Sequence, residues 1–184
     1  KVPFIVKWPG KSDKNIRRKE LISSIDIVPT LMEAAGRDIP KELPGLSLFP
    51  LLKSGKPEWR KYVYADGLGS ALHFYYPRRS VRGERYKLIH NPLRDRENPK
   101  VDFYAAHLNG HFDGGTEYEE INSSNDIVKQ AYKTWRNPPE FELYDLENDP
   151  WEYNELSSNP KYYDILEQLK NQLLSSLIHQ KNHL

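Results

Sequence analysis

The chain has 184 residues, 38% hydrophobic, 29% charged and 12% aromatic, a composition that predicts a folded protein with a core. Its 27 basic and 26 acidic residues leave a net charge of +1, and this balance argues against broad nucleic-acid binding. No apolar run is long enough for a transmembrane helix. The chain has no cysteine, which excludes disulfides, a thiol nucleophile and cysteine-bound zinc within these residues.

A short strand and a helix are the first elements expected in chain order. Residues 2–6 are apolar and are followed by a Pro-Gly turn, so we predict a buried strand there. Because a natural terminus seldom begins inside a core strand, we expect the chain to be a fragment of a longer protein. Residues 20–36 predict a helix with Asp26 as its N-cap and Gly36 at its left-handed end. We favour this capping role over metal binding by Asp26.

Further strands are predicted between residues 62 and 91. Residues 62–65 are rich in aromatic and branched side chains, which strands prefer. Residues 78–91 predict two strands joined by Gly83 and Glu84.

Basic residues at this hairpin are candidates for anion binding. Arg78, Arg79 and Arg82 carry forked donors that fit the oxygen pair of a sulfate or a uronate. The alternative is an ordinary strand with a solvated basic edge. His73 lies in the glycine-rich loop before the hairpin and is a candidate contact for a substrate hydroxyl or sulfate.

The region 92–139 is expected to be a long and mostly irregular surface insertion. His107, His111 and Asp113 suggest a metal site, but neither a helical spacing nor a carboxylate motif accompanies them, and nearby glycines favour a loop. We therefore predict no metal ligand in the chain. Residues 127–135 suggest a short helix that ends before two prolines.

The stretch 141–156 begins with a strand pattern and ends in a turn. Its alternation predicts Phe141, Leu143 and Leu146 in a core, with Glu142 and Glu147 facing water. An Asn-Asp-Pro sequence then favours a tight turn.

The last predicted element is a helix over residues 160–178. Asn159 is a good N-cap, and Pro160 fits the first helical position. Leucines recur at helical spacing, so we expect this helix to pack against the sheet made by the strands.

Several of these segments resemble the C-terminal part of formylglycine-dependent sulfatases. The strongest likeness is in the 141–156 stretch, through Glu142 to Leu146, Asn148 to Pro150, and Glu152, Asn154 and Leu156. Residues 2–10, 26–36 and 45–52 and the hairpin are similar to other segments of that family. Short matches such as Tyr76-Pro77, Arg79-Ser80-Val81, residues 88–91 and residues 102–104 are most like its heparan N-sulfatase (N-sulphoglucosamine sulphohydrolase) subfamily.

The resemblance implies an α+β fold that begins with the tail of a large α/β domain. Residues 1–52 would end that catalytic domain, and residues 53–184 would form a C-terminal subdomain, a small antiparallel sheet packed against a C-terminal helix. The family uses a formylglycine, made in a C/S-x-P-x-R motif, beside a calcium ion. That motif does not occur here, so we expect no catalytic residue, metal ligand or cofactor in this chain, which alone would be inactive.

The function implied for the full-length protein is hydrolysis of sulfate esters or sulfamates on a sulfated glycan, with N-sulfoglucosamine as the expected sugar. Partners would be this glycan and the N-terminal catalytic domain, with no nucleic acid and no membrane. His73, Arg78 and Arg79 would contact substrate. The resemblance implies a periplasmic, secreted or lysosomal location. The alternatives are another hydrolase of the alkaline phosphatase superfamily and a non-catalytic glycan-binding module.

Overall fold

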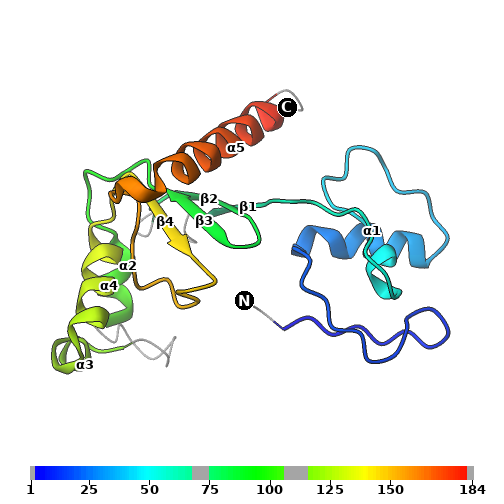
Figure 1. The fold of residues 1–184 in the computed structure, drawn as a ribbon, viewed down its shortest axis with the longest axis horizontal. Helices are drawn as coiled ribbons and strands as arrows, with labels where there is room; N and C mark the ends of the chain where they lie inside the picture. Colours follow the sequence, from blue (N-terminus) through cyan, green and yellow to red (C-terminus); the bar gives the residue numbers. More distant parts are fainter. Residues whose placement is uncertain (1–2, 68–74, 106–115, 182–184) are drawn as a thin grey trace. The chain divides into compact units, whose positions relative to one another are not determined.

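The structure is a computed structural model that describes residues 3–67, 75–105 and 116–181. It divides into two compact units, Lys1–Val63 and Tyr64–Leu184, and each is described by itself (Figure 1). Across the described ranges, every helix falls short of the length and apolarity needed to cross a membrane.

The first unit is built around one helix. A 3-10 turn, η1 (Ser24–Asp26), leads into α1 (Ile27–Ala34), and a second turn, η2 (Phe49–Leu52), follows later. Gly36 has a φ of 65°, and its N–H donates to the carbonyl of Glu33 while Arg37 N–H reaches Met32. These two bonds satisfy carbonyls at the helix end, which confirms the predicted role of Gly36.

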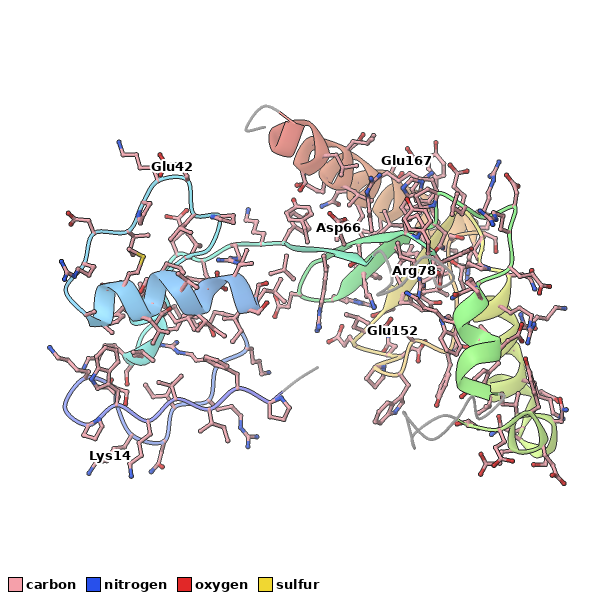
Figure 2. All side chains as sticks on the ribbon, turned by 180° about the vertical axis from the view of Figure 1, so that it is seen from behind. Lys14, Glu42, Asp66, Arg78, Glu152 and Glu167 are labelled. Atoms are coloured by element: carbon pink, nitrogen blue, oxygen red, sulfur yellow. The ribbon has the colours of Figure 1, made fainter. Side chains whose placement is uncertain are left out.

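The strand predicted over residues 2–6 is wrong for the residues that are described. Residues 3–7 have no regular structure and are exposed, and 90% of the Ile5 surface is accessible. A strand needs a neighbour for its backbone hydrogen bonds, and the described part of this unit has no strand before Val63. Figure 2 shows Lys14 and Glu42 at the surface of loops in the same unit.

A four-stranded sheet forms the centre of the second unit. The strands are β1 (Val63–Gly67), β2 (Arg78–Arg82), β3 (Tyr86–His90) and β4 (Phe141–Asp145), and their order is β1-β2-β3-β4. The β2–β3 and β3–β4 pairs are antiparallel. The strands predicted between residues 62 and 91 and at the start of the 141–156 stretch are therefore confirmed, as is the hairpin.

The C-terminal helix packs on one face of this sheet. A 3-10 turn, η4 (Pro160–Tyr162), opens α5 (Tyr163–Lys181), and the Asn159 side chain accepts from the backbone N–H of Lys161, as predicted for a cap. Contacts join α5 to both β2 and β3. The core between them includes Val81, Leu88 and Leu143 from the sheet and Leu166, Leu169 and Leu173 from the helix.

The described residues of the region predicted as irregular form three helices, so that prediction is wrong in this respect. They are α2 (Pro99–Ala105), α3 (Tyr118–Ser123) and α4 (Asp126–Arg136), and α4 contacts both of the others. Asn125 accepts from the N–H of Val128 and caps α4, which confirms the helix predicted at 127–135. His107, His111 and Asp113 lie outside the described residues.

The outer edge of β4 is closed by the segment that follows its turn. The N–H of Leu143 donates to the Glu155 carboxylate at 3.0 Å, and the N–H of Leu156 donates to the Leu143 carbonyl at 2.9 Å. Within the turn, Asp149 accepts from the N–H of Asn154 at 2.7 Å. The 141–156 stretch therefore forms an edge strand and covers it.

Candidate functional site

The face of the sheet opposite α5 carries a set of polar side chains. Ser80 pairs with Ile89, and Ile89 pairs with Glu142. Side chains two residues apart on a strand share a face, so Arg78 and Asn91 lie on the same side as Glu142. We call this side the polar face and define it by Arg78, Ser80, Lys87, Asn91, Glu142 and Tyr144.

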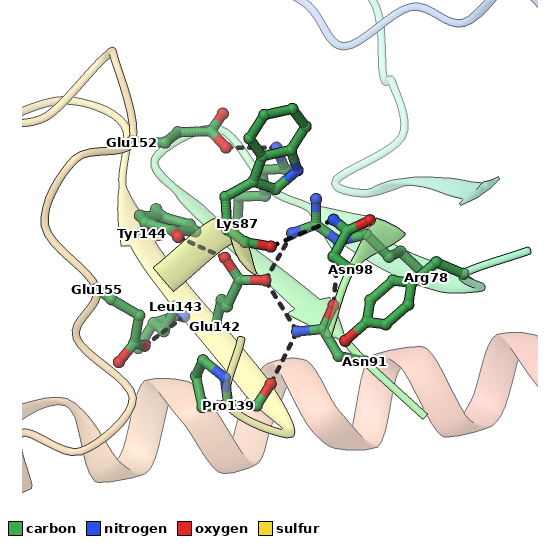
Figure 3. Close-up of polar contacts among 12 residues, drawn as sticks. Arg78, Lys87, Asn91, Asn98, Pro139, Glu142, Leu143, Tyr144, Glu152 and Glu155 are labelled. Atoms are coloured by element: carbon green, nitrogen blue, oxygen red, sulfur yellow. Dashed lines mark hydrogen bonds and ion pairs between the residues drawn. The ribbon is translucent and has the colours of Figure 1, made fainter. Parts of the chain in front are cut away.

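A closed network of hydrogen bonds joins β2, the residue that follows β3, and β4 on the polar face (Figure 3). Arg78 donates from Nη2 to Glu142 Oε1 at 2.5 Å and from Nε to Asn91 Oδ1 at 3.0 Å. Asn91 Nδ2 donates to the same Glu142 oxygen and to the Pro139 carbonyl, both at 2.8 Å. The Tyr144 hydroxyl donates to Glu142 Oε2 at 2.5 Å.

Glu142 is therefore buried, and the prediction that it faces water is wrong. Only 2% of its surface is exposed. The alternating pattern identified a half-buried strand, but both faces of β4 are covered. A buried carboxylate needs a cation and hydrogen-bond donors, and Arg78, Asn91 and Tyr144 supply them.

The network also changes the acidity of two tyrosines. Burial, followed by the negative charge of Glu142 and the hydrogen bond to it, raises the pKa of Tyr144. Burial is likewise the main cause that raises the pKa of Tyr76, against the opposing charge of Arg78. Both hydroxyls therefore remain protonated donors at neutral pH.

A second ion pair lies beside the network, at Lys87 and Glu152. Lys87 is directly opposite Tyr144 in the β3–β4 register, and its ammonium is 2.5 Å from the Glu152 carboxylate. Glu152 has a φ of 61°, an uncommon conformation for a residue with a side chain. The tight turn thus holds Glu152 in place over β3.

Asn98 approaches the network from the residue before α2. Asn98 is buried, donates to the Trp135 carbonyl at 3.2 Å, and accepts from the backbone N–H of Lys100 at 3.1 Å. Figure 3 draws Asn98 at the Arg78 end of the network. Burial and the positive charge of Arg78 lower the pKa of Lys100.

The structure does not place the guanidinium groups of Arg78 and Arg79 where both could bind the same anion. They are neighbours on β2, so their side chains leave opposite faces of the sheet. Arg79 is 40% exposed and lies 3.9 Å from Asp66, a weak surface ion pair. His73 lies outside the described residues.

In the first unit, the buried polar residue is Asp26, which is fully shielded from solvent. It occupies the predicted N-cap position, but its carboxylate does not bond α1 amides. It accepts instead from the N–H of Ser23 at 2.8 Å, from the N–H of Leu46 at 2.9 Å and from Arg60 Nη2 at 2.6 Å. Asp26 therefore joins the start of the helix to two later segments.

The described ranges contain no group of three or more histidine, aspartate or glutamate side chains that could hold a metal. Both cations of the polar face, Arg78 and Lys87, are paired with glutamates, and the described residues do not assemble a nucleophile and a metal around them. Sequence reasoning missed Glu142, Asn91, Asn98 and Lys100. One signal was present for Glu142, since it is followed after one residue by Tyr144, a side chain that seeks a polar partner when buried.

Comparison with known proteins places these features in a family. The model of the family described as N-sulphoglucosamine sulphohydrolase, C-terminal, matches residues 1–103. An ulvan-active sulfatase of Formosa agariphila is 33% identical over 180 residues, covering 95% of this chain and 32% of the relative. Human N-sulphoglucosamine sulphohydrolase is 28% identical over 163 residues, covering 83% of this chain and 31% of the human protein.

A solved structure of a 2-O GAG sulfatase has a similar fold. The TM-score is 0.56 at 25% identity, and the match covers 85% of this chain and 24% of that one. The chain therefore spans about a third or less of the proteins that it matches. An α+β fold with a four-stranded antiparallel sheet and helices agrees with this neighbour.

Proposed function

Because the chain belongs to the N-sulphoglucosamine sulphohydrolase C-terminal family, we propose that it is part of a sulfatase that hydrolyses sulfate esters or sulfamates of a sulfated glycan. The match of the family model to residues 1–103 carries this proposal. The named sulfatases that align with almost the whole chain support it.

N-sulfoglucosamine is the sugar that we propose as substrate. The family description and the human relative support this choice. Two other relatives are named for activity on ulvan and for a 2-O position, so the sugar must be tested directly.

The first unit would complete a larger catalytic domain, with residues 1–52 as its end and residues 53–184 as the following subdomain. Apolar side chains are unusually exposed in this unit, which is typical of a surface that another part of a protein covers. They include Phe4, Ile5, Val6, Ile22, Ile25, Ile27, Val28 and Leu31. We infer that the N-terminal part of the same protein covers them.

The catalytic groups would lie in that N-terminal part. A formylglycine and a calcium ion there would supply the nucleophile and offset the charge of the sulfate. The residues of this chain would orient the glycan, with His73, Arg78 and Arg79 as the proposed contacts. Among the described residues, Arg78 donates from Nε and Nη2, which leaves Nη1 for a ligand oxygen. A periplasmic, secreted or lysosomal location would suit such an enzyme.

The test is an activity assay with the full-length protein that carries these residues. Sulfate release would be measured from N-sulfated glucosamine, from 6-O-sulfated glucosamine and from an aryl sulfate, with the 184-residue chain as a control. We expect turnover of the N-sulfated sugar by the full-length protein and none by the control. Activity on the other two alone would contradict the sugar assignment and keep the sulfatase assignment.

Two outcomes would replace the proposal with another function. Hydrolysis of phosphate or phosphonate esters without sulfate release would identify a different hydrolase. Tight glycan binding by the 184-residue chain, with no turnover by the full-length protein, would identify a binding module.

A further inference from the structure

Residues 11–19 of the first unit form a loop with a strong excess of positive charge, which we call the basic loop. Its nine residues include five basic side chains and one acidic one, a net charge of +4. The other 175 residues carry 22 basic and 25 acidic side chains, a net charge of −3. The chain's overall charge of +1 therefore conceals a local positive potential, which attracts anionic polymers.

The carboxylates in and beside the basic loop are already paired. Asp13 lies 3.3 Å from the ammonium of Lys53 and accepts from the backbone N–H of Ser54 at 2.7 Å. Glu20 lies 3.3 Å from Arg18 Nη1. The remaining four cations of the loop form no ion pair in the described part of the chain. They are Lys11, Lys14 (labelled in Figure 2), Arg17 and Lys19, and all four are exposed.

The backbone of the basic loop is fixed by contacts with the end of η2 and the residues that follow it. Arg18 donates from Nε to the Leu51 carbonyl at 2.9 Å and from Nη1 to the Gly55 carbonyl at 2.7 Å. The N–H of Asp13 donates to the Leu52 carbonyl at 2.9 Å. The four unpaired cations therefore extend from an ordered backbone, and less conformational entropy is lost when a ligand binds them.

The basic loop should also stay at the surface when the rest of the protein covers the apolar side chains of the first unit. Lysine and arginine side chains are almost never fully buried without a paired group. The four unpaired cations would each need such a group if another domain covered them. An exposed anionic polymer supplies these groups without burial.

We propose that the basic loop binds the sulfated glycan as a polymer, at sugars other than the one whose sulfate is removed. This proposal rests on the proposed function. Charge complementarity favours this partner, because a sulfated glycan carries oxyanions on successive sugars and the loop offers several cations within nine residues. Several weak contacts on one chain add to its affinity, so the loop would favour long glycans over short ones.

The test compares the full-length wild type with two variants that each lose four positive charges. The loop variant carries Lys11→Gln, Lys14→Gln, Arg17→Gln and Lys19→Gln. The control variant loses the same numbers of lysine and arginine side chains at exposed positions of the second unit, through Arg96→Gln, Lys129→Gln, Lys133→Gln and Lys161→Gln. Calorimetric titration would measure the Kd of heparin, of N-sulfated glucosamine and of duplex DNA, at low and at physiological salt.

We expect the loop variant to raise the Kd of heparin about tenfold, because four exposed ionic contacts each contribute a small part of the affinity. Wild-type binding should weaken as salt rises, and this salt dependence should be smaller for the loop variant. The control variant should bind like wild type. A further variant that keeps the charges, with Lys11→Arg, Lys14→Arg, Arg17→Lys and Lys19→Arg, should retain most of the affinity. The pair Lys11→Gln and Lys14→Gln should lose an intermediate part, and it replaces the loop variant if thermal unfolding shows that four changes disrupt the first unit.

Three results would overturn the inference. The first is an equal Kd of heparin for wild type and the loop variant. The second is an equal loss of affinity for N-sulfated glucosamine, since the loop would then hold the reacting sugar. The third is tighter binding of duplex DNA than of heparin by wild type, which would identify a nucleic acid as the partner. Failure of the proposed function is a separate result: wild type would release no sulfate from any substrate, and the titrations would still decide whether the loop binds the polymer.

Discussion

Arg78 and Glu142 are 64 residues apart in the sequence, and their charged groups lie 2.5 Å apart on the polar face. The Glu142 side chain is almost completely shielded, while Arg78 keeps part of its surface in solvent. The carboxylate therefore depends on the guanidinium far more than an exposed partner would.

Removal of Arg78 is expected to destabilise the second unit strongly. Arg78→Met leaves the Glu142 carboxylate buried without a cation, and loss of one partner of a buried pair costs about 3–5 kcal/mol. Adding Glu142→Gln should recover part of this loss, because it removes the unpaired charge. Urea unfolding of the full-length protein would measure both effects. Strictly additive losses in the double variant would show that the two side chains are not coupled.

Tyr144→Phe is expected to lower the free energy of unfolding by about 1–3 kcal/mol, because Glu142 loses a buried donor. Tyr153→Phe is the control, since Tyr153 is exposed in the following turn. The pKa of Tyr144 is raised by its burial, so its titration should be missing from an ultraviolet pH scan of the folded protein near pH 10. A tyrosine that titrates normally at this position would contradict the buried hydrogen bond.

Acid should remove the stabilisation that Asp145 provides. Two hydrogen bonds from Arg85, at 3.0 and 2.7 Å, lower the pKa of Asp145 from 3.8 to about 2. Because the folded-state pKa is the lower one, this contribution is complete above pH 3.8 and disappears as the pH falls towards 2.

The measurement is the urea midpoint as a function of pH for wild type and Asp145→Asn. The variant should be less stable at neutral pH, and the difference between the two proteins should shrink between pH 3.8 and about 2. Asp38→Asn, at an exposed aspartate, should follow wild type throughout. A constant difference in stability across this pH range would show that protonation of Asp145 is not coupled to unfolding.

Gly45→Ala is expected to disrupt the first unit more than Gly36→Ala. A Cβ at Gly45 would lie 2.1 Å from the Ile25 carbonyl oxygen, so the backbone that holds Asp26 must move. Gly36 has open space around it and a left-handed φ. Alanine at this position should therefore lower the free energy of unfolding by only about 1 kcal/mol. Thermal unfolding of the two variants would give the comparison. A smaller loss for Gly45→Ala would show that the segment relaxes without cost.

Local patterns were enough to predict most of the second unit. The β2–β3 hairpin, β4 and α5 each have a period, a turn or a cap that is visible in the sequence. The strand predicted over residues 2–6 was wrong because an apolar run does not reveal whether another strand is present to pair with it. The helices α2 and α3 were missed because both are short, and short helices have little periodicity.

The candidate site was harder to predict than the fold. Arg78 was identified by its residue type, but its partners Asn91 and Glu142 lie just after β3 and on β4, which only the tertiary structure brings together. Glu142 was assigned to solvent because strand alternation cannot show that both faces are covered. Lys100 was not considered, since a lysine in a polar region gives no sign of its burial.

The closed edge of β4 limits how this sheet can grow. Leu143 already gives its outward N–H to Glu155 and its carbonyl to Leu156, so a strand from elsewhere finds no free backbone there. In the strand order β1-β2-β3-β4, the strand at the opposite edge of the sheet is β1. Among the described residues, β1 is therefore the edge that remains for a further strand, whether from the same protein or from another copy.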